Sequence, residues 1–319
     1  MKAVVFHSYG MDVLKIEEVE KPTPKENEVL VKVCATSVNP AEWYGMSGMF
    51  LARLGNGLFK PKDNRLGADF AGIVEAVGRD VTDFKPGDEV FGGRSGAYTE
   101  YVCVQKGIAR KPANITFEQA GSVAIAGLTA LQGLRDHGNL QPGQKVLING
   151  ASGGVGTFAV QIAKALGAEV TAVCSTKNVE MVRSLGADLV IDYTKEDFTR
   201  TRQRYDLFLD VAGSRSWIEC RRILTPKATV VIIGGPKGKV IGPLKHIIPM
   251  RLFSMRASQK VVFFIANFNR EDMEVMRKLM ESGKVKPVID RIYPLNQINE
   301  AMSYLGTGHA KAKIAVTIQ

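Results

Sequence analysis

Valine recurs at every second position near the start of the chain, at 29, 31 and 33, which predicts a strand over residues 28–38. Shorter strands are predicted over 71–78 and 89–92, where glycine bounds each run. Pro86-Gly87-Asp88 predicts a turn, because proline presets φ and glycine accepts positive φ. Short strands separated by such turns predict a small barrel over residues 1 to about 115.

The pattern changes near Thr116, where apolar strands begin to alternate with amphipathic helices. Thr116 to Gln119 resemble a capping box and predict a helix start. Strands are expected over 146–148, 170–173, 189–191, 207–211, 229–233 and 261–265, and helices over 155–166, 179–185 and 217–224. Continuous apolar strands between helices predict a parallel sheet covered on both faces, a doubly wound α/β fold.

The later part of the chain predicts a return to the first domain. Residues 237–260 are basic and apolar, and we expect a surface helix packed over a groove; a substrate lid and a membrane-surface patch are the alternatives. A helix is expected over 270–282, followed by short strands around a helix at 295–305. We therefore assign 1–118, completed by 266–319, to one domain and 119–265 to the other.

Composition fits an ordinary globular protein, with 45% hydrophobic and 23% charged residues among 319. Its four cysteines are far apart and form no CxxC pair, which favours a reducing cytoplasm over a secreted scaffold or a zinc ribbon. No apolar run approaches the length of a transmembrane helix. The net charge of +10 is interpreted as a diffuse basic surface that attracts a polyanionic cofactor, and binding to nucleic acid or to an anionic membrane is not favoured on this charge.

A glycine motif lies between a predicted strand and a predicted helix. Residues 149–156 read Asn-Gly-Ala-Ser-Gly-Gly-Val-Gly, with Gly150, Gly153 and Gly156 in a GxxGxxG spacing. One glycine makes the turn, the next admits the pyrophosphate to the backbone, and the last lets the helix pack closely. The helix N-terminus then offers N–H donors to phosphate. This context predicts dinucleotide binding by residues 150–156, including Ser152, Gly154 and Val155.

The end of the second strand of this domain predicts the cofactor's identity. An NAD enzyme places a carboxylate there, whereas this chain reads Cys174-Ser175-Thr176-Lys177-Asn178. Ser175 and Thr176 can donate to a phosphate and Lys177 supplies charge, at about 1.5–3 kcal/mol for each charge-assisted bond. NADPH is the predicted cofactor. Ser175 or Thr176 could also cap a helix, and the two roles are compatible. Tyr193 could contact the adenosine phosphate or be an ordinary loop tyrosine.

These motifs together resemble the zinc-free quinone oxidoreductase branch of the medium-chain dehydrogenase/reductase superfamily over essentially the whole chain. The matching segments are residues 39–48, 67–78, 86–91, 126–131 and 150–156. The resemblance implies a GroES-like β-barrel catalytic domain, a Rossmann domain and a cleft between them. It also implies that Asn39, Tyr44 and Thr129 face the nicotinamide and substrate.

The resemblance further implies that Gly234, Gly235 and the segment containing Phe264 and Ile265 line the cofactor cleft, and that the protein is a homodimer. Zinc-containing relatives carry Gly-His-Glu where this chain has Gly67-Ala68-Asp69, and their cysteine-rich lobe is missing. Zinc would then lack its usual three protein ligands. A metal-free enzyme is therefore expected, and the four histidines are interpreted as surface or packing residues.

Without a metal, the expected substrates are already electrophilic, namely quinones and α,β-unsaturated carbonyl compounds. Hydride addition leaves negative charge on oxygen, which hydrogen-bond donors can stabilise. The candidates are the Tyr44 hydroxyl, the Asn39 amide and the cofactor's ribose hydroxyl. Tyr44 could instead serve aromatic packing. The alternative functions are a non-catalytic NADPH-binding protein with a structural or RNA-binding role, and a zinc alcohol dehydrogenase.

Overall fold

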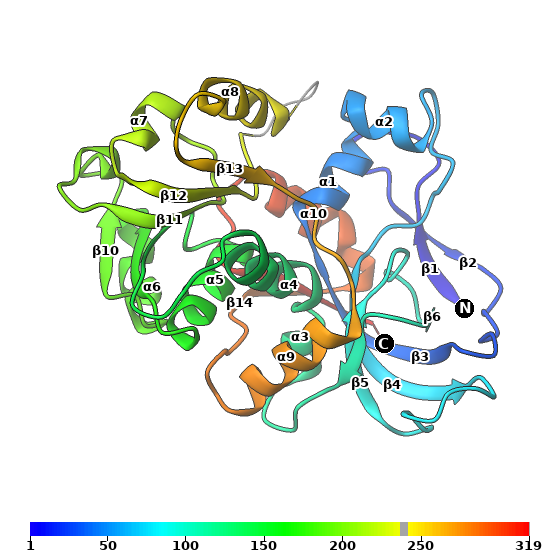
Figure 1. Ribbon diagram of the computed structural model, residues 1–319. Helices are drawn as coiled ribbons and strands as arrows, with labels where there is room; N and C mark the ends of the chain where they lie inside the picture. Colours follow the sequence, from blue (N-terminus) through cyan, green and yellow to red (C-terminus); the bar gives the residue numbers. More distant parts are fainter. Residues whose placement is uncertain (237–241, 319) are drawn as a thin grey trace. The chain divides into compact units, whose positions relative to one another are not determined.

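The computed structural model describes residues 1–236 and 242–318, and this described chain divides into two compact units (Figure 1). Unit 1 comprises Met1–Leu128, Asn267–Gly283 and Pro287–Gln319, and unit 2 comprises Thr129–Ala266 and Lys284–Lys286. Unit 1 therefore extends beyond residue 118, the boundary expected from the sequence. The reason is that helix α3 (Phe117–Ala120) contacts strands β3 (Val29–Val38) and β4 (Asp69–Val77) of the same unit.

Unit 1 is built on a curved sheet in the order β14-β15-β3-β4-β5-β7, with β6 paired to β3 and a separate β1-β2 pair. The strands not yet given are β1 (Lys2–Val5), β2 (Lys15–Glu18), β5 (Glu89–Gly93), β6 (Tyr101–Val104), β7 (Ile108–Arg110), β14 (Ile289–Pro294) and β15 (Lys313–Thr317). β15 runs antiparallel to β3, with Val316 opposite Thr36. The tail thus returns to the first domain, as its pattern predicts.

The helices of unit 1 are only partly those that the sequence predicts. Thr116 caps α3 by accepting from the Gln119 backbone N–H at 3.3 Å, which confirms the capping box. The helix α9 (Arg270–Glu281) lies within the range expected, and the predicted helix at 295–305 is a 3-10 turn followed by α10 (Ile298–Gly306). Two helices were not predicted: α1 (Pro40–Ser47) and α2 (Phe50–Asn56).

Unit 2 contains a parallel sheet in the order β10-β9-β8-β11-β12-β13, which confirms the doubly wound α/β class. The strands are β8 (Lys145–Asn149), β9 (Glu169–Cys174), β10 (Leu189–Asp192), β11 (Tyr205–Asp210), β12 (Leu224–Ile232) and β13 (Lys260–Phe263). From β8 the chain builds outward through β9 to β10 and then returns to add β11 on the other side. The reversal of strand order between β8 and β11 is where ligands bind in such folds.

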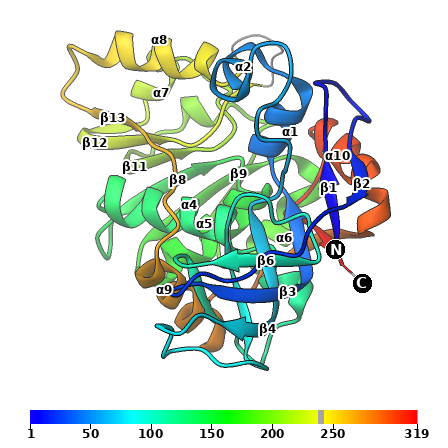
Figure 2. The ribbon, with the colours of Figure 1, turned by 90° about the vertical axis from the view of Figure 1, so that its right-hand side faces the viewer.

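Helices cover both faces of the unit 2 sheet (Figures 1 and 2). α5 (Gly154–Ala165) and α6 (Val179–Ser184) lie on one face, and α7 (Trp217–Arg221) and α8 (Leu244–Ser254) lie on the other. α4 (Ala124–Gln132) crosses the boundary between the units and continues into a π-helical turn at Gly133–His137.

Two expected elements of unit 2 differ from the structure. The helix predicted over 217–224 ends at Arg221, because Leu224 already begins β12 beside Tyr205 of β11. The surface helix expected within 237–260 is α8, whereas residues 237–241 of that prediction lie outside the described residues.

Candidate functional site

The glycine motif forms the turn from β8 into α5, as its spacing predicts. Gly150 adopts φ +84°, a left-handed conformation that favours glycine. A Cβ at Gly156 would lie 2.2 Å from the Gly150 carbonyl oxygen, so the third glycine is required for close packing. Ser152, Gly154 and Val155 are half-buried in the same turn.

Gly153 differs from its two neighbours in the motif. It caps the N-terminus of α5 with φ −84° and ψ 178°, a conformation open to any residue. A Cβ there would meet nothing closer than the Gly150 oxygen at 3.5 Å. The chain itself therefore has no steric need for glycine at 153, at the helix end where N–H groups are free to bind an anion.

A buried polar cluster that the sequence did not reveal lies at the point where the strand order reverses. Asn149 ends β8, and its amide donates to Asp210 Oδ1 at the end of β11 over 2.8 Å. Asp210 Oδ1 also accepts from the Gly213 backbone N–H at 2.9 Å, and its Oδ2 lies 2.8 Å from His246 Nε2. The cluster joins the glycine loop, the loop after β11 and α8. His246, expected as a surface or packing residue, is thus a buried hydrogen-bonding residue.

Asn178 connects the glycine loop to the segment predicted to meet the adenosine phosphate. Its Nδ2 donates to Ser152 Oγ at 3.0 Å and to Ser175 Oγ at 3.2 Å. Its Oδ1 is buried with no hydrogen-bond partner among the described residues. Since Ser175 only accepts in this contact, its own hydroxyl hydrogen is available to a ligand. Lys177 is exposed beside it.

Thr176 does not fit the role predicted for it. Asp192 pairs with Cys174 in the register of β10 and β9, which brings its carboxylate to the Thr176 hydroxyl. That hydroxyl donates to Asp192 Oδ2 at 2.5 Å. This hydrogen bond, with others from Thr194, lowers the pKa of Asp192 below its ordinary value. A carboxylate therefore lies near residues 174–178, although the local sequence contains none. The Thr176 hydroxyl donates its hydrogen to this carboxylate and not to a ligand.

The other predicted cofactor residues lie in unit 2, most of them after the carboxyl ends of its strands. Tyr193 follows β10 and is 54% exposed. Gly234 and Gly235 follow β12, and a Cβ on Gly213 would lie 2.5 Å from the Gly235 Cα, so these two loops touch. Phe264 follows β13 and stacks on His137 with ring centroids 4.0 Å apart, whereas Ile265 is 86% exposed. Thr129 is half-buried in α4.

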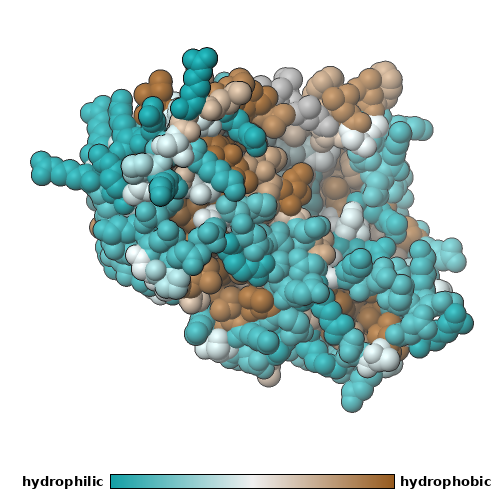
Figure 3. Space-filling model, viewed as in Figure 1, coloured by the Kyte–Doolittle hydropathy of each residue, from teal (hydrophilic) through white to brown (hydrophobic). Residues whose placement is uncertain are grey.

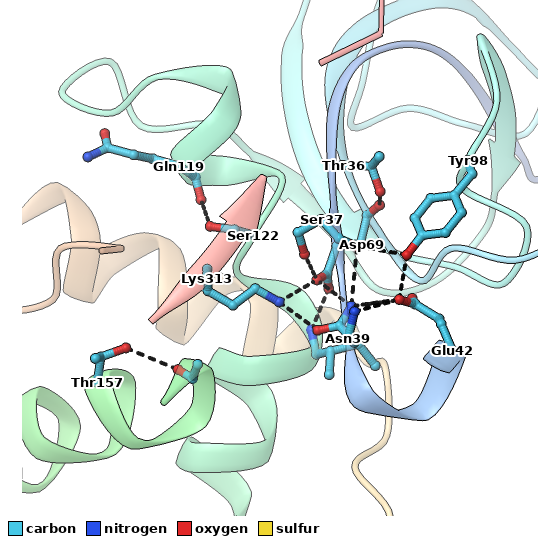
Figure 4. Close-up of polar contacts among 12 residues, drawn as sticks. Thr36, Ser37, Asn39, Glu42, Asp69, Tyr98, Gln119, Ser122, Thr157 and Lys313 are labelled. Atoms are coloured by element: carbon cyan, nitrogen blue, oxygen red, sulfur yellow. Dashed lines mark hydrogen bonds and ion pairs between the residues drawn. The ribbon is translucent and has the colours of Figure 1, made fainter. Parts of the chain in front are cut away.

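Asn39 lies in unit 1, in a buried network shown in Figure 4. It precedes α1, and its backbone N–H donates to Glu42 at 2.6 Å. The Asn39 amide nitrogen lies 3.1 Å from Asp69 Oδ2, and its oxygen accepts from Lys313 Nζ at 2.5 Å. The amide expected to meet substrate is 2% exposed and hydrogen-bonded within the protein.

Charges from distant parts of the chain meet in this network. Lys313 of β15 bonds Asp69 of β4 at 3.1 Å, and both side chains are buried. The Tyr98 hydroxyl donates to Glu42 at 2.5 Å. Desolvation raises the pKa of Glu42 to about 7, opposed by the Tyr98 hydrogen bond. The Lys313 ammonium pairs with Asp69, and its charge also lowers the pKa of Glu42. This buried network holds the N-terminus of α1 against the sheet.

Tyr44 lies on α1, two residues after Glu42. Its ring meets that of Trp43 edge-on, with centroids 5.4 Å apart, so the expected aromatic packing is present. Burial raises the pKa of the Tyr44 hydroxyl above its ordinary value of 10.0. The hydroxyl therefore stays protonated near neutral pH and can act as a donor.

Comparison with known proteins identifies the family. A model described as "alcohol dehydrogenase GroES-like domain" matches residues 25–113, and one described as "zinc-binding dehydrogenase" matches 185–316. An NADPH-dependent alkenal/one oxidoreductase of Arabidopsis thaliana is 36% identical over 99% of this chain and 79% of its own length. The chain belongs to the medium-chain dehydrogenase/reductase superfamily.

Solved structures agree with this assignment. The quinone oxidoreductase from Coxiella burnetii has a TM-score of 0.86 and 31% identity, over 100% of this chain and 99% of its own. The Escherichia coli quinone oxidoreductase complexed with NADPH has a TM-score of 0.83 and 27% identity, over 99% and 100%. This medium-chain oxidoreductase therefore has the expected fold, a GroES-like domain and a Rossmann-type sheet.

The name of the second family model raises the question of zinc. Ala68 stands between Gly67 and Asp69, where zinc-containing relatives carry histidine. Gly67 has φ +99°, and a Cβ on it would lie 2.4 Å from the Tyr98 backbone nitrogen, so the turn at 67–69 is sterically fixed. Among the described residues, no group of three or more His, Cys, Asp or Glu side chains is arranged to hold a metal ion.

Proposed function

We propose that this oxidoreductase uses NADPH to reduce quinones or α,β-unsaturated carbonyl compounds without a catalytic metal. The observation that carries the proposal is Gly153, a glycine that the chain does not need at the N-terminus of α5. Space left by a missing side chain beside free N–H groups fits a pyrophosphate. The unpartnered Asn178 oxygen nearby gives a further polar group that a bound ligand can satisfy.

Cofactor preference in this proposal depends on Ser175 and Lys177. Ser175 has a free donor and Lys177 an exposed ammonium, both suited to an adenosine phosphate. The Asp192 oxygens are engaged by Thr176 and Thr194, which leaves the carboxylate poorly placed to bind the ribose hydroxyls of NAD. Names of relatives support the choice, since one is called NADPH-dependent and another was solved with NADPH.

The substrate class follows from the chemistry that remains without a metal. When bound, the reduced nicotinamide supplies the hydride. A quinone or enone that accepts it develops negative charge on oxygen, which a protonated hydroxyl stabilises. We assign this role to Tyr44, whose hydroxyl stays protonated, and we assign Asn39 to positioning α1 because its amide is bonded to Asp69 and Lys313.

We also propose a homodimer through β13. This strand ends the described order of the unit 2 sheet, and its outer edge can pair with another strand. Light scattering of the purified protein measures the mass directly, and a monomer at all concentrations contradicts this part of the proposal.

The cofactor assignment is tested by Lys177→Ala. We expect KM for NADPH to rise about tenfold or more, because one charge-assisted contact contributes about 1.5–3 kcal/mol, while KM for NADH changes little. Steady-state rates with a panel of quinones and enones, followed by nicotinamide absorbance, provide the measurement. Lys106→Ala, an exposed lysine of unit 1, controls for the change in net charge. Equal effects on both cofactors contradict the assignment, and no turnover of any substrate contradicts the reductase.

A further inference from the structure

The basic character of this chain is concentrated in one segment. Between Glu219 and Glu271 the sequence holds ten Lys or Arg residues and no Asp or Glu. The remaining 32 Lys and Arg residues equal the 32 Asp and Glu residues in number, so this segment accounts for the whole net charge of +10. The excess of positive charge thus lies between residues 220 and 270, whereas the other basic residues are spread over the chain and balanced by acidic ones.

Helix α8 lies within this segment and presents two different faces. Its buried side, with His246, Ile247, Met250 and Ser254, packs in unit 2, and His246 is bonded to Asp210. The outward side, together with Met255 directly after the helix, carries large apolar residues that are 49–77% exposed: Ile248, Leu252, Phe253 and Met255. Exposed cations adjoin them in the sequence at Lys245, Arg251 and Arg256. These seven residues are called the α8 face, and Figure 3 shows hydrophobic and hydrophilic residues side by side over this helix.

We propose that the α8 face docks on the surface of an anionic lipid bilayer. A helix with aliphatic and aromatic side chains flanked by Lys and Arg, and without acidic residues, is suited to lie in the headgroup region. The apolar side chains enter the acyl boundary while the cations meet lipid phosphates. The proposed attachment is peripheral, with α8 lying along the bilayer surface. No described helix is long and apolar enough to cross a membrane.

The charge of the α8 face favours an anionic bilayer over a second copy of the chain. In a symmetric dimer whose two-fold axis passes through the α8 face, the three cations of one copy would approach those of the other. Like charges brought together at an interface oppose association. A nucleic acid would satisfy the cations but would leave Ile248, Leu252 and Met255 without an apolar environment. An anionic bilayer meets both requirements.

Co-sedimentation with lipid vesicles tests the proposal. The full-length protein is mixed with vesicles of phosphatidylcholine alone, or of equal parts phosphatidylcholine and phosphatidylglycerol. We expect binding to the anionic vesicles only, and weaker binding as salt is raised. Arg251→Gln with Arg256→Gln should weaken binding about fivefold per charge, roughly 25-fold together.

A second variant separates apolar insertion from charge. Leu252→Asp with Phe253→Asp should abolish vesicle binding, because both exposed side chains lose their apolar contact. Ile292→Asp with Arg79→Glu changes an apolar and a basic residue of unit 1 that are also exposed, and should bind as the wild type does. Reduction of a water-soluble quinone by the α8 variants reports whether the proposed reductase is intact, so failure of the two proposals is distinguishable.

Several outcomes would overturn the membrane assignment. They are no binding of the wild type to anionic vesicles, equal binding to neutral ones, and equal loss in the control variant. A fall in mass by light scattering on Leu252→Asp with Phe253→Asp, without vesicles present, would show that a second copy covers the α8 face.

Discussion

In the glycine loop, one glycine is required for folding and another is explained better by ligand binding. Gly156 is needed by the chain, since any Cβ there meets the Gly150 oxygen and the Ala151 backbone. Gly153 is not, because its conformation is ordinary and the space beside it is open. Two positions in one motif thus carry the same residue for different physical reasons.

This difference gives a matched pair of variants. Gly156→Ala should lower the unfolding free energy by about 1–3 kcal/mol, the usual cost of overpacking. Gly153→Ala should cost no more than the loss of a favourable N-cap residue, about 0.5–1 kcal/mol, yet weaken NADPH binding at least about tenfold. Thermal unfolding and fluorescence titration with NADPH measure the two effects. Unchanged affinity in Gly153→Ala contradicts the phosphate assignment.

Tyr44 is the second residue with a defined test. Because burial raises the pKa of its hydroxyl, the wild-type kcat should show no loss from its ionisation between about pH 7 and pH 9. Tyr44→Phe should lower kcat about 10–100-fold and leave KM for NADPH unchanged, since only stabilisation of the developing oxyanion is removed. Tyr101→Phe, also in unit 1, is the control. Wild-type kcat in Tyr44→Phe would assign the ring to packing with Trp43.

Among the elements, α1 is held in place by a buried network of charged and polar groups. Its first turn is bonded to β4 through Asn39 and Asp69, to β15 through Lys313, and to Tyr98 through Glu42. Because Tyr44 lies on this helix, the network sets the position of the proposed donor.

The raised pKa of Glu42 predicts how stability depends on pH. The folded chain holds this proton up to about pH 7, whereas the unfolded chain releases it near 4.5, so ionisation opposes folding. Stability from this group should therefore fall as pH rises from about 4.5 to about 7 and stay constant above. In the Glu42→Gln variant, the decrease in unfolding free energy between about pH 5 and pH 8 should be smaller by roughly 1–3 kcal/mol, as measured by urea unfolding. Parallel curves for the two proteins would contradict the raised pKa.

Local signals predicted most elements of unit 2 and the strands β3, β4 and β5. The capping box at Thr116 and the glycine turn at 150–156 were readable because both depend on residues close in sequence. The helices α1 and α2 were missed although Pro40 at the start of α1 is a helix-start signal. The end of α7 was misplaced because pairing with β11 makes Leu224 a strand residue.

For the whole molecule, the parts of the site that sequence reasoning missed are those assembled by long-range pairing. Asp192 reaches Thr176 only through the register of β9 and β10, and Asp210 reaches Asn149 only because β11 adds beside β8. Lys313 and Asn39 are 274 positions apart. No local sequence pattern predicts such contacts. The family resemblance predicted the fold but not these hydrogen-bond partners.

The pairing of β15 with β3 also affects how this protein can fold while it is being synthesised on the ribosome. Unit 1 begins first, but β15 and β14, which extend its sheet beyond β3, are made after all of unit 2. Until Lys313 has been made, the Asp69 carboxylate lacks its ammonium partner, so closing the first sheet early would bury uncompensated charge. The nascent N-terminal segment is therefore expected to stay open to chaperones and proteases until translation is nearly finished.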